Sequence, residues 1–415
     1  MTKKEKSWIL YDWANSAFTL IIVTTIFPIF FKDYIAGTLK SFESTAYLGY
    51  ANSAYALIVA IMAPVLGTMA DFKGMKKKLF TGFFITGVIS TFLLAFSAKD
   101  YWEICLLIYI LASVGFAATN IFYNAFLVDV TTDDRMDWVS SSGFGWGYIG
   151  SVIPFILSMG LINFHNVLSI SQILATRISF VFTGLWWFVF TIPFLKNVRQ
   201  KYYKKTRKNF IRKSFKRLKN FFLKIKDYKN IVYFLLAYFF YIDGVYTIIK
   251  MAVPYAKDIG MKNEMLMLLL LFIQVVAFPF ALLFGKLAKK YSPKTMIIIG
   301  IVIYFVITFF ASFISKPYHF WILGFLVASA QGGVQSLSRS VYSKIIPKNS
   351  SAEFFGFYNI LGKFAAILGP FMVGIFSHLL GNSRFGILSL SILFLVGIIF
   401  ISKVDTDARQ NTNTG

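Results

Sequence analysis

Three ionisable residues lie far inside apolar stretches of this chain. Asp243 comes twelve residues after Ile231, where its stretch begins, and Lys250 follows seven residues later on the same helical face. Lys363 comes ten residues after Glu353. At ~1.5 Å per helical residue, Asp243 and Lys363 would lie roughly 18 and 15 Å deep. Ionisable groups at such depth are candidates for a functional site.

Two chemical roles suit these charges. A buried carboxylic acid such as Asp243 can carry a proton, and a buried amine such as Lys363 can bind a substrate carboxylate or neutralise Asp243. Both signs of charge together would suit a zwitterion such as an amino acid. The alternative is a permanent Asp243–Lys363 bridge between helices, because a buried ion pair alone is weak evidence of function.

Uncharged polar side chains in the same stretches can form hydrogen bonds within a helical bundle. For any one of them, contact between helices is a more common role than contact with substrate. As a set they complete a candidate substrate or coupling site, which we assign to Asp243, Lys363, Lys250, Asn15, Asn124, Gln331, Tyr246, Tyr358 and Asn359.

These residues need long apolar elements to hold them, and the sequence has twelve. Nearly all reach the ~20 residues that cross ~30 Å of hydrocarbon as a helix, and they lack the alternation of barrel strands. The sequence therefore predicts an all-α membrane protein with twelve transmembrane helices. The stretches are Trp8–Phe31, Ala46–Ala70, Leu79–Ala98, Trp102–Val128, Val139–Phe164, Thr176–Leu195, Ile231–Ala256, Glu264–Ala288, Thr295–Ser315, His319–Leu337, Phe354–Leu379 and Phe385–Ile401.

The net charge of +24 has a topological explanation. The two ends of the chain and the loops on their side hold 32 of the 42 Lys and Arg residues. The positive-inside rule therefore places both termini in the cytoplasm of a multi-pass protein, and makes nucleic-acid binding an unnecessary reading of the charge. The Lys-rich ends and the single cysteine, Cys105, fit a cell inner (plasma) membrane.

One basic loop divides the twelve stretches six and six. It predicts an N-terminal six-helix bundle at 1–195, a cytoplasmic linker at 196–230, a C-terminal six-helix bundle at 231–404 and a disordered tail at 405–415. The linker holds 15 basic residues and one acid, Asp227, with apolar residues at three- and four-residue steps. This pattern predicts an amphipathic helix on anionic lipid, although a flexible linker that only sets topology is the alternative.

The turn after the second stretch has the composition of a conformational gate. Gly67 allows a neighbouring helix to approach closely, Asp71 can meet a helix N-terminus or a cation, and Gly74 supplies the tight turn. The spacing Gly67-x-x-Ala70-Asp71-x-x-Gly74-x-Lys76-Lys77 resembles motif A of the major facilitator superfamily. That resemblance implies a gate, whose cation is open among Lys73, Lys76 and Arg135. We assign Gly67, Asp71, Gly74, Lys76, Asp12 and Arg135 to it.

Weak internal repetition supports two related halves. Gly67 and Gly285 end the second and eighth stretches, and Gly143 and Gly356 open the fifth and eleventh. The second copy of the gate turn is degenerate, because Lys289 stands where the acid should be. Parallel repeats of this kind are used by transporters that work by alternating access.

Further segments resemble one branch of the facilitators, the unknown major facilitator family, which includes the fungal vacuolar amino-acid effluxers. They are Tyr11–Phe18, Phe27–Phe31, Tyr123–Leu127, Tyr241–Val245, Gln274–Pro279, Gln331–Ser340, Ser351–Asn359 and Gly362–Pro370. The resemblance implies the twelve-helix facilitator fold with two six-helix bundles. It also implies that the first, fourth, seventh and tenth helices line the cavity, which would place Asn15, Asn124, Asp243 and Gln331 around it.

The function we expect is secondary active transport of a small organic solute by alternating access, with amino-acid efflux coupled to protons as its specific form. A lipid or lysophospholipid flippase on the same fold is the alternative, and a membrane enzyme or sensor is a third. The sequence has no phosphate-binding Gly-Lys-Ser/Thr loop, no nucleophile elbow and no metal-ligand cluster. We therefore expect no enzyme activity, no catalytic residues, no cofactor and no metal, and a monomer that contacts only its substrate and lipid.

Overall fold

The computed structural model confirms an all-helical membrane protein. It describes residues 1–205, 228–258, 263–314, 316, 318–380 and 383–406. Twelve helices in these ranges are long and apolar enough to cross a membrane. The predicted amphipathic linker helix lies largely outside the described residues. So does the predicted disordered tail at 405–415, apart from its first two residues.

The first six spans run from Lys3 to Asn197. The first is a composite of α1 (Lys3–Phe18), η1 (Thr19–Thr24), α2 (Ile26–Phe30) and η2 (Phe31–Ile35). The other five are α3 (Ser41–Ala70), α4 (Met75–Leu94), α5 (Trp102–Ala125) with the short α6 (Leu127–Val130), α7 (Met136–Asn163) and α8 (Gln172–Asn197).

The second six spans repeat this plan. They are α10 (Lys229–Asp258), α11 (Asn263–Tyr291), α12 (Pro293–Ser312), α13 (His319–Ile345), α14 (Ser351–Leu380), preceded by the 3₁₀ turn η4 (Lys348–Ser350), and α15 (Ser383–Ser389) with α16 (Ser391–Ser402). Short polar turns between consecutive spans make neighbours antiparallel.

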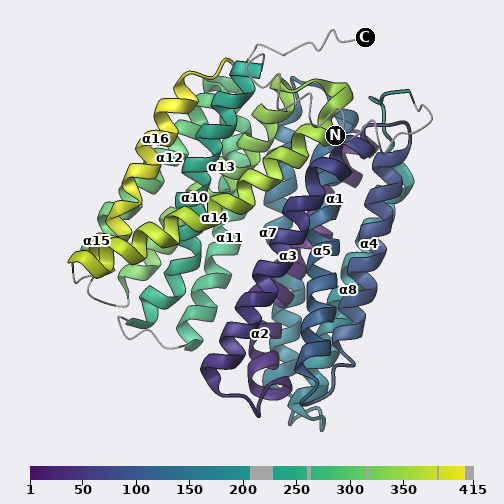
Figure 1. Cartoon of the computed structure of the whole chain (residues 1–415), viewed down its shortest axis with the longest axis vertical. Helices are drawn as coiled ribbons and strands as arrows, with labels where there is room; N and C mark the ends of the chain where they lie inside the picture. Colours follow the sequence, from purple (N-terminus) through teal and green to yellow (C-terminus); the bar gives the residue numbers. More distant parts are fainter. Residues whose placement is uncertain (206–227, 259–262, 315, 317, 381–382, 407–415) are drawn as a thin grey trace.

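The two sets of six helices form two bundles (Figure 1). The bundles meet at the end that holds the start of α1 and the end of α16, which we call the terminal side. Toward the opposite end, the far side, α14 and α15 lean away from α2 and α3. The polar contacts between bundles described below all lie on the terminal side.

The first span is wound more widely than an α-helix at two places. η1 and η2 are π-helical, and in η1 the Thr24 hydroxyl donates to the Thr19 carbonyl five residues earlier. π turns inside helices are rare and often occur at functional sites. η1 fits this pattern because Thr19, Leu20, Val23 and Thr24 line the central cavity.

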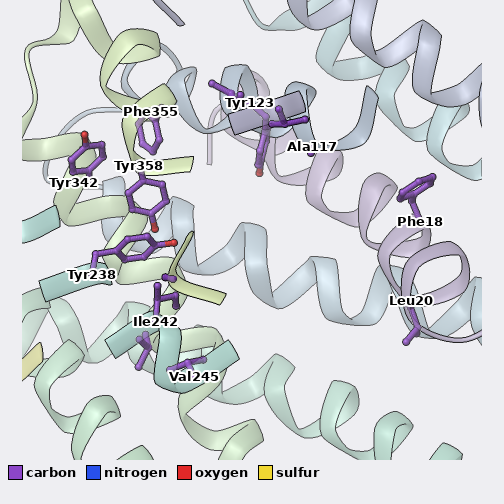
Figure 2. Packing of buried hydrophobic residues seen from close by; sticks show 14 of the residues in the cluster. Phe18, Leu20, Ala117, Tyr123, Tyr238, Ile242, Val245, Tyr342, Phe355 and Tyr358 are labelled. Carbon is purple, nitrogen blue, oxygen red and sulfur yellow. The ribbon is translucent and has the colours of Figure 1, made fainter. Parts of the chain in front are cut away.

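Aromatic rings fix the second bundle around that cavity. Tyr238 of α10 stacks on Tyr358 of α14 with ring centroids 4.1 Å apart, and Tyr342 of α13 stacks on the same ring at 5.1 Å. Figure 2 shows this column with Phe355 beside it. Offset and stacked aromatic pairs add geometric preference to apolar burial, so the column holds three helices in one register.

Several boundaries differ from those the sequence predicted. The tenth span does not end at Leu337, because α13 continues to Ile345. Its serine hydroxyls bond to carbonyls of their own helix, as Ser338 does to Val334 and Ser343 to Arg339, so a polar stretch stays helical. The last span breaks into α15 and α16 at Leu390.

Candidate functional site

A cavity of about 1370 Å³ lies between the two bundles. Eight of the nine residues assigned to the substrate or coupling site line it: Asn15, Asn124, Gln331, Tyr246, Lys250, Tyr358, Asn359 and Lys363. They come from helices of both bundles. Sequence reasoning therefore gathered residues that the fold brings to one chamber.

Asp243 is the exception, and the expected Asp243–Lys363 pair is wrong for the described structure. The Asp243 carboxylate is fully buried and does not line the cavity. It accepts the Gly369 backbone N–H of α14 at 2.8 Å and the Thr247 hydroxyl at 3.4 Å. A side chain at Gly369 would meet Thr247 and Asp243 at 2.1 and 2.9 Å, so glycine exposes the backbone to this carboxylate.

Lys363 has a different neighbour. Its ammonium lies 5.2 Å from the centre of the Tyr55 ring, which belongs to α3 of the other bundle. A cation over an aromatic face is attracted by the ring's quadrupole. Lys363 therefore spans the chamber between the bundles.

Arg339 is the strongest feature of the chamber that sequence reasoning missed. Its guanidinium forms an ion pair with Asp12 at 3.2 Å and donates to Asn124 at 3.2 Å, both in the first bundle. It also donates to the Ser140 hydroxyl and carbonyl, each at 2.9 Å. The side chain is only 3% exposed, so these contacts replace its water.

Aromatic rings surround the same guanidinium. Trp8, Tyr123 and Phe144 lie 4.5, 5.4 and 4.4 Å from it. All three rings belong to the first bundle, whereas Arg339 belongs to α13 of the second. The stretch predicted from sequence ends at Leu337, two residues before Arg339, whereas α13 continues to Ile345 and carries Arg339 within the helix.

The gate residues Asp71 and Gly67 join α3 to the start of α14. Asp71 accepts the backbone N–H groups of Ala352 at 2.9 Å and Glu353 at 3.2 Å, in the first turn of α14, where N–H groups point out of the helix toward an acceptor. A Cβ on Gly67 would lie 2.3 Å from the Ala352 carbonyl oxygen. Gly74 has φ +74° and opens α4 in the left-handed conformation that glycine tolerates.

Of the candidate gate cations, Lys76 contacts the second bundle in this conformation. Its fully buried ammonium pairs with Asp129 at 2.7 Å and donates to the Ser351 hydroxyl of the second bundle at 2.8 Å. Arg135 lies elsewhere, because its guanidinium pairs with Glu5 at 2.8 Å within the first bundle. Asp12 lies at the contact between bundles through its pair with Arg339.

Two further ion pairs cross the terminal side. Asp137 accepts Lys344 and the Ser340 hydroxyl, each at 2.6 Å, and Asp133 pairs with Lys348 at 3.3 Å. Beyond Arg339, nearer the middle of α7 and α13, Ser141 and Ser336 share a hydrogen bond of 2.9 Å. The terminal side is thus closed by charged and hydroxyl contacts.

The repeated glycines occupy equivalent crossings of the two bundles. Gly67 faces Ala352 of α14, and Gly285 of α11 faces Ser141 of α7, where a Cβ would lie 2.5 Å away. In the second copy of the gate turn, the basic Lys289 stands at the position of Asp71, and the acid Asp134 lies ahead of α7. A hydrogen bond from Thr132 lowers the pKa of Asp134, and Arg135 and Lys289 lower it by smaller amounts.

A strap formed by Arg199–Lys205 lies over the gate turn. The Gln200 amide accepts the Gly74 N–H at 2.9 Å and donates to the Ala70 carbonyl at 3.0 Å. Asp129 accepts the backbone N–H groups of Lys201 and Tyr202, each at 2.8 Å. The Lys348 ammonium of the second bundle lies 5.3 Å from the centre of the Tyr202 ring, so the strap contacts both bundles.

Replacing Gln200 by alanine should loosen the closed terminal side. Net loss of one hydrogen bond from the strap, at ~0.5–1.5 kcal/mol, predicts roughly two- to tenfold faster modification of a cysteine placed at Ser336. The measurement is labelling by a membrane-impermeant maleimide; the native Cys105 is buried. Lys201→Ala is the matched control, because its backbone N–H keeps the bond to Asp129 and, among the described residues, its side chain contacts only the neighbouring Tyr202 ring. Equal rates in both variants would contradict a latching role.

The chain is similar to known transport proteins. Residues 1–413 match the family model described as vacuole effluxer Atg22 like. The MFS-type transporter YxiO of Bacillus subtilis (strain 168) is 47% identical over 99% of this chain and 98% of its own length. Autophagy-related protein 22 of Coccidioides immitis (strain RS) is 24% identical over 89% of this chain and 74% of its own length.

Solved structures share the fold. The major facilitator transporter FucP in its outward conformation superimposes with a TM-score of 0.72, at 16% identity, over 97% of this chain and 98% of its own. These comparisons lend no support to the lipid-flippase alternative.

Proposed function

Since the chain belongs to the Atg22-like vacuole effluxer family and is a major facilitator transporter rather than an enzyme, we propose that it exports amino acids by proton-coupled alternating access. One observation carries the proposal. Polar contacts close the two bundles on one side of a large cavity, while the bundles diverge on the other. A carrier of this kind needs one such side to open as the other closes.

The charge distribution indicates the orientation of the cavity in the membrane. With the terminal side in the cytoplasm, as the excess of Lys and Arg there indicates, the cavity faces outward or into a lumen. Gate opening would then require Arg339 to leave Asp12, and Ser351 and Ala352 to leave Lys76 and Asp71. Each of these bonds joins opposite bundles, which supports rocking rather than local movement of one loop.

The proposal is tested with purified full-length protein in liposomes. A pH gradient across the membrane should drive flux of labelled amino acids, and a protonophore should abolish that flux. Amino acids should also exchange with unlabelled amino acids on the other side. Folded, correctly inserted protein that moves no amino acid under any pH gradient would contradict the proposal.

Within this function we assign Asp243 to proton coupling. A proton on its carboxylate would weaken the bond to the Gly369 N–H in α14, the helix that crosses α3 at the gate. Asp243→Asn should therefore abolish pH-driven flux, while its amide oxygen still accepts the Gly369 N–H and preserves the fold. Thr247→Val is the control, because it removes the neighbouring hydroxyl and keeps the carboxyl group. Undiminished pH-driven flux in Asp243→Asn would remove Asp243 from this role.

A further inference from the structure

The charged residues that line the cavity do not balance. Among the described lining residues the acid is Asp12 and the bases are Lys250, Arg339 and Lys363. Asp12 and Arg339 neutralise each other as an ion pair. The chamber therefore keeps the positive charge of two lysines.

The two lysines differ in their surroundings. Lys250 follows Asp243 by two helical turns in α10 and interacts electrostatically with that buried carboxylate. Lys363 feels the like charge of Lys250 instead, and in the described structure its ammonium faces the Tyr55 ring and no carboxylate. The positive charge of Lys363 thus has no counter-charge among the residues that the structure describes. A partly buried ammonium in that position favours an anion.

A polar group beside Lys363 is also unused. Asn359 precedes it by one turn on the same face of α14, and its side-chain oxygen has no hydrogen-bond partner among the described residues. An amide can accept a ligand N–H or O–H while the ammonium takes an anionic oxygen. Lys363 and Asn359 together form a two-point site at the wall of the chamber.

We propose that the solute of this chain carries an anionic group, carboxylate or phosphate, which binds Lys363 of α14 and is drawn inward by Lys250 of α10. This proposal rests on the proposed transport function and narrows its substrate. It replaces the two-signed Asp243–Lys363 site expected from sequence with a site of positive sign. An anion at Lys363 competes with the Tyr55 ring of the opposite bundle, so its binding changes a contact between the bundles.

The test uses probes of one shape and different charge. N-acetyl-leucine is an anion, leucine a zwitterion, N-acetyl-leucinamide neutral and leucinamide a cation. Glycerol 3-phosphate against glycerol separates a phosphate preference from a carboxylate preference. Thermal stabilisation of the purified full chain by each probe, titrated to an apparent affinity, reports binding without requiring flux.

The expected result is stabilisation by carboxylate-bearing or phosphate-bearing probes and little by their amide or hydroxyl counterparts. Lys363→Gln should weaken the anionic probe about tenfold, as loss of one charge-assisted hydrogen bond does, and Lys250→Gln should weaken it about threefold. Lys363→Arg should keep the preference. Lys290→Gln is the matched control, because Lys290 also lies over a tyrosine, Tyr291 at 5.0 Å, but outside the cavity.

Two outcomes would overturn the inference. One is equal or stronger stabilisation by the neutral or cationic probes. The other is an anion preference that persists in folded Lys363→Gln and Lys250→Gln. Transport of a neutral amide without any anion preference would leave the transport proposal standing and remove this one. Binding of the anionic probes without flux under any gradient would remove the transport proposal and leave the anion site standing.

Discussion

Replacing Arg339 by leucine is expected to abolish transport and to open the terminal side. The change leaves the Asp12 carboxylate without its cation and removes the bonds to Asn124 and Ser140. Breaking a buried pair by removing one partner costs about 3–5 kcal/mol. Because Arg339 and all of these partners lie in opposite bundles, that cost falls on the closed conformation, which should lose about 10²–10³-fold in relative population.

Two measurements check this expectation. Labelling of a cysteine at Ser336 by an impermeant maleimide should rise by about two orders of magnitude, and amino-acid or probe flux in liposomes should disappear. Arg339→Lys keeps the charge but loses the planar fork of the guanidinium, so its labelling rate and flux should lie between those of wild type and Arg339→Leu. The double variant Asp12→Asn with Arg339→Leu should recover part of the closed state, because it leaves no unpaired charge. An unchanged labelling rate in Arg339→Leu would show that the pair does not hold the gate.

The second large effect is expected from Gly67→Leu. Even the Cβ of the new side chain would lie 2.3 Å from the Ala352 carbonyl oxygen and 3.0 Å from the Glu353 Cα, both backbone atoms. Overpacking costs about 1–3 kcal/mol, and α14 can relieve it by moving away, which also withdraws Ala352 and Glu353 from Asp71. We therefore expect a terminal side that stays open and a carrier that no longer cycles.

Gly82→Leu provides the matched comparison in the same half of the chain, because nothing lies within 4 Å of a Cβ at Gly82. It should label and transport like wild type. Gly356→Leu should reproduce the Gly67 effect from the other helix, since a Cβ at Gly356 would lie 2.6 Å from the Ala63 carbonyl oxygen. Normal flux in Gly67→Leu would contradict the close-crossing argument.

Patterns that depend on chain periodicity were readable from the sequence. Apolar run length predicted the twelve spans, and the Gly67, Asp71 and Gly74 spacing predicted a turn that meets another helix. Nine polar and charged residues of the long apolar runs were predicted to form a substrate or coupling site, and all of these except Asp243 line the cavity. These features are local, or follow from the cost of exposing polar groups to lipid.

Pairing between helices that are distant in sequence was not readable in the same way. Asp243 was expected to seek a cation, but the Gly369 backbone N–H is closer and needs no second charge. The predicted tenth stretch stops at Leu337, before Arg339, whereas the helix continues because the hydroxyls of Ser338 and Ser343 bond to its own carbonyls. Which partner a buried group finds depends on how two helices distant in sequence cross, and one sequence does not contain that information.

The π turns of the first span hold one residue more than regular helix needs. A π turn closes its hydrogen bonds over five residues instead of four, so Thr19–Thr24 contains more chain than an α-helix of the same height. Removing one residue from this segment would let it rewind as regular helix with little change in the direction that Asp12 faces. Removing one residue from the regular helix between Asp12 and Thr19 would instead turn Asp12 by about 100° around the axis, away from Arg339. A single-residue deletion should therefore be less harmful within Thr19–Thr24 than in the last turn of α1.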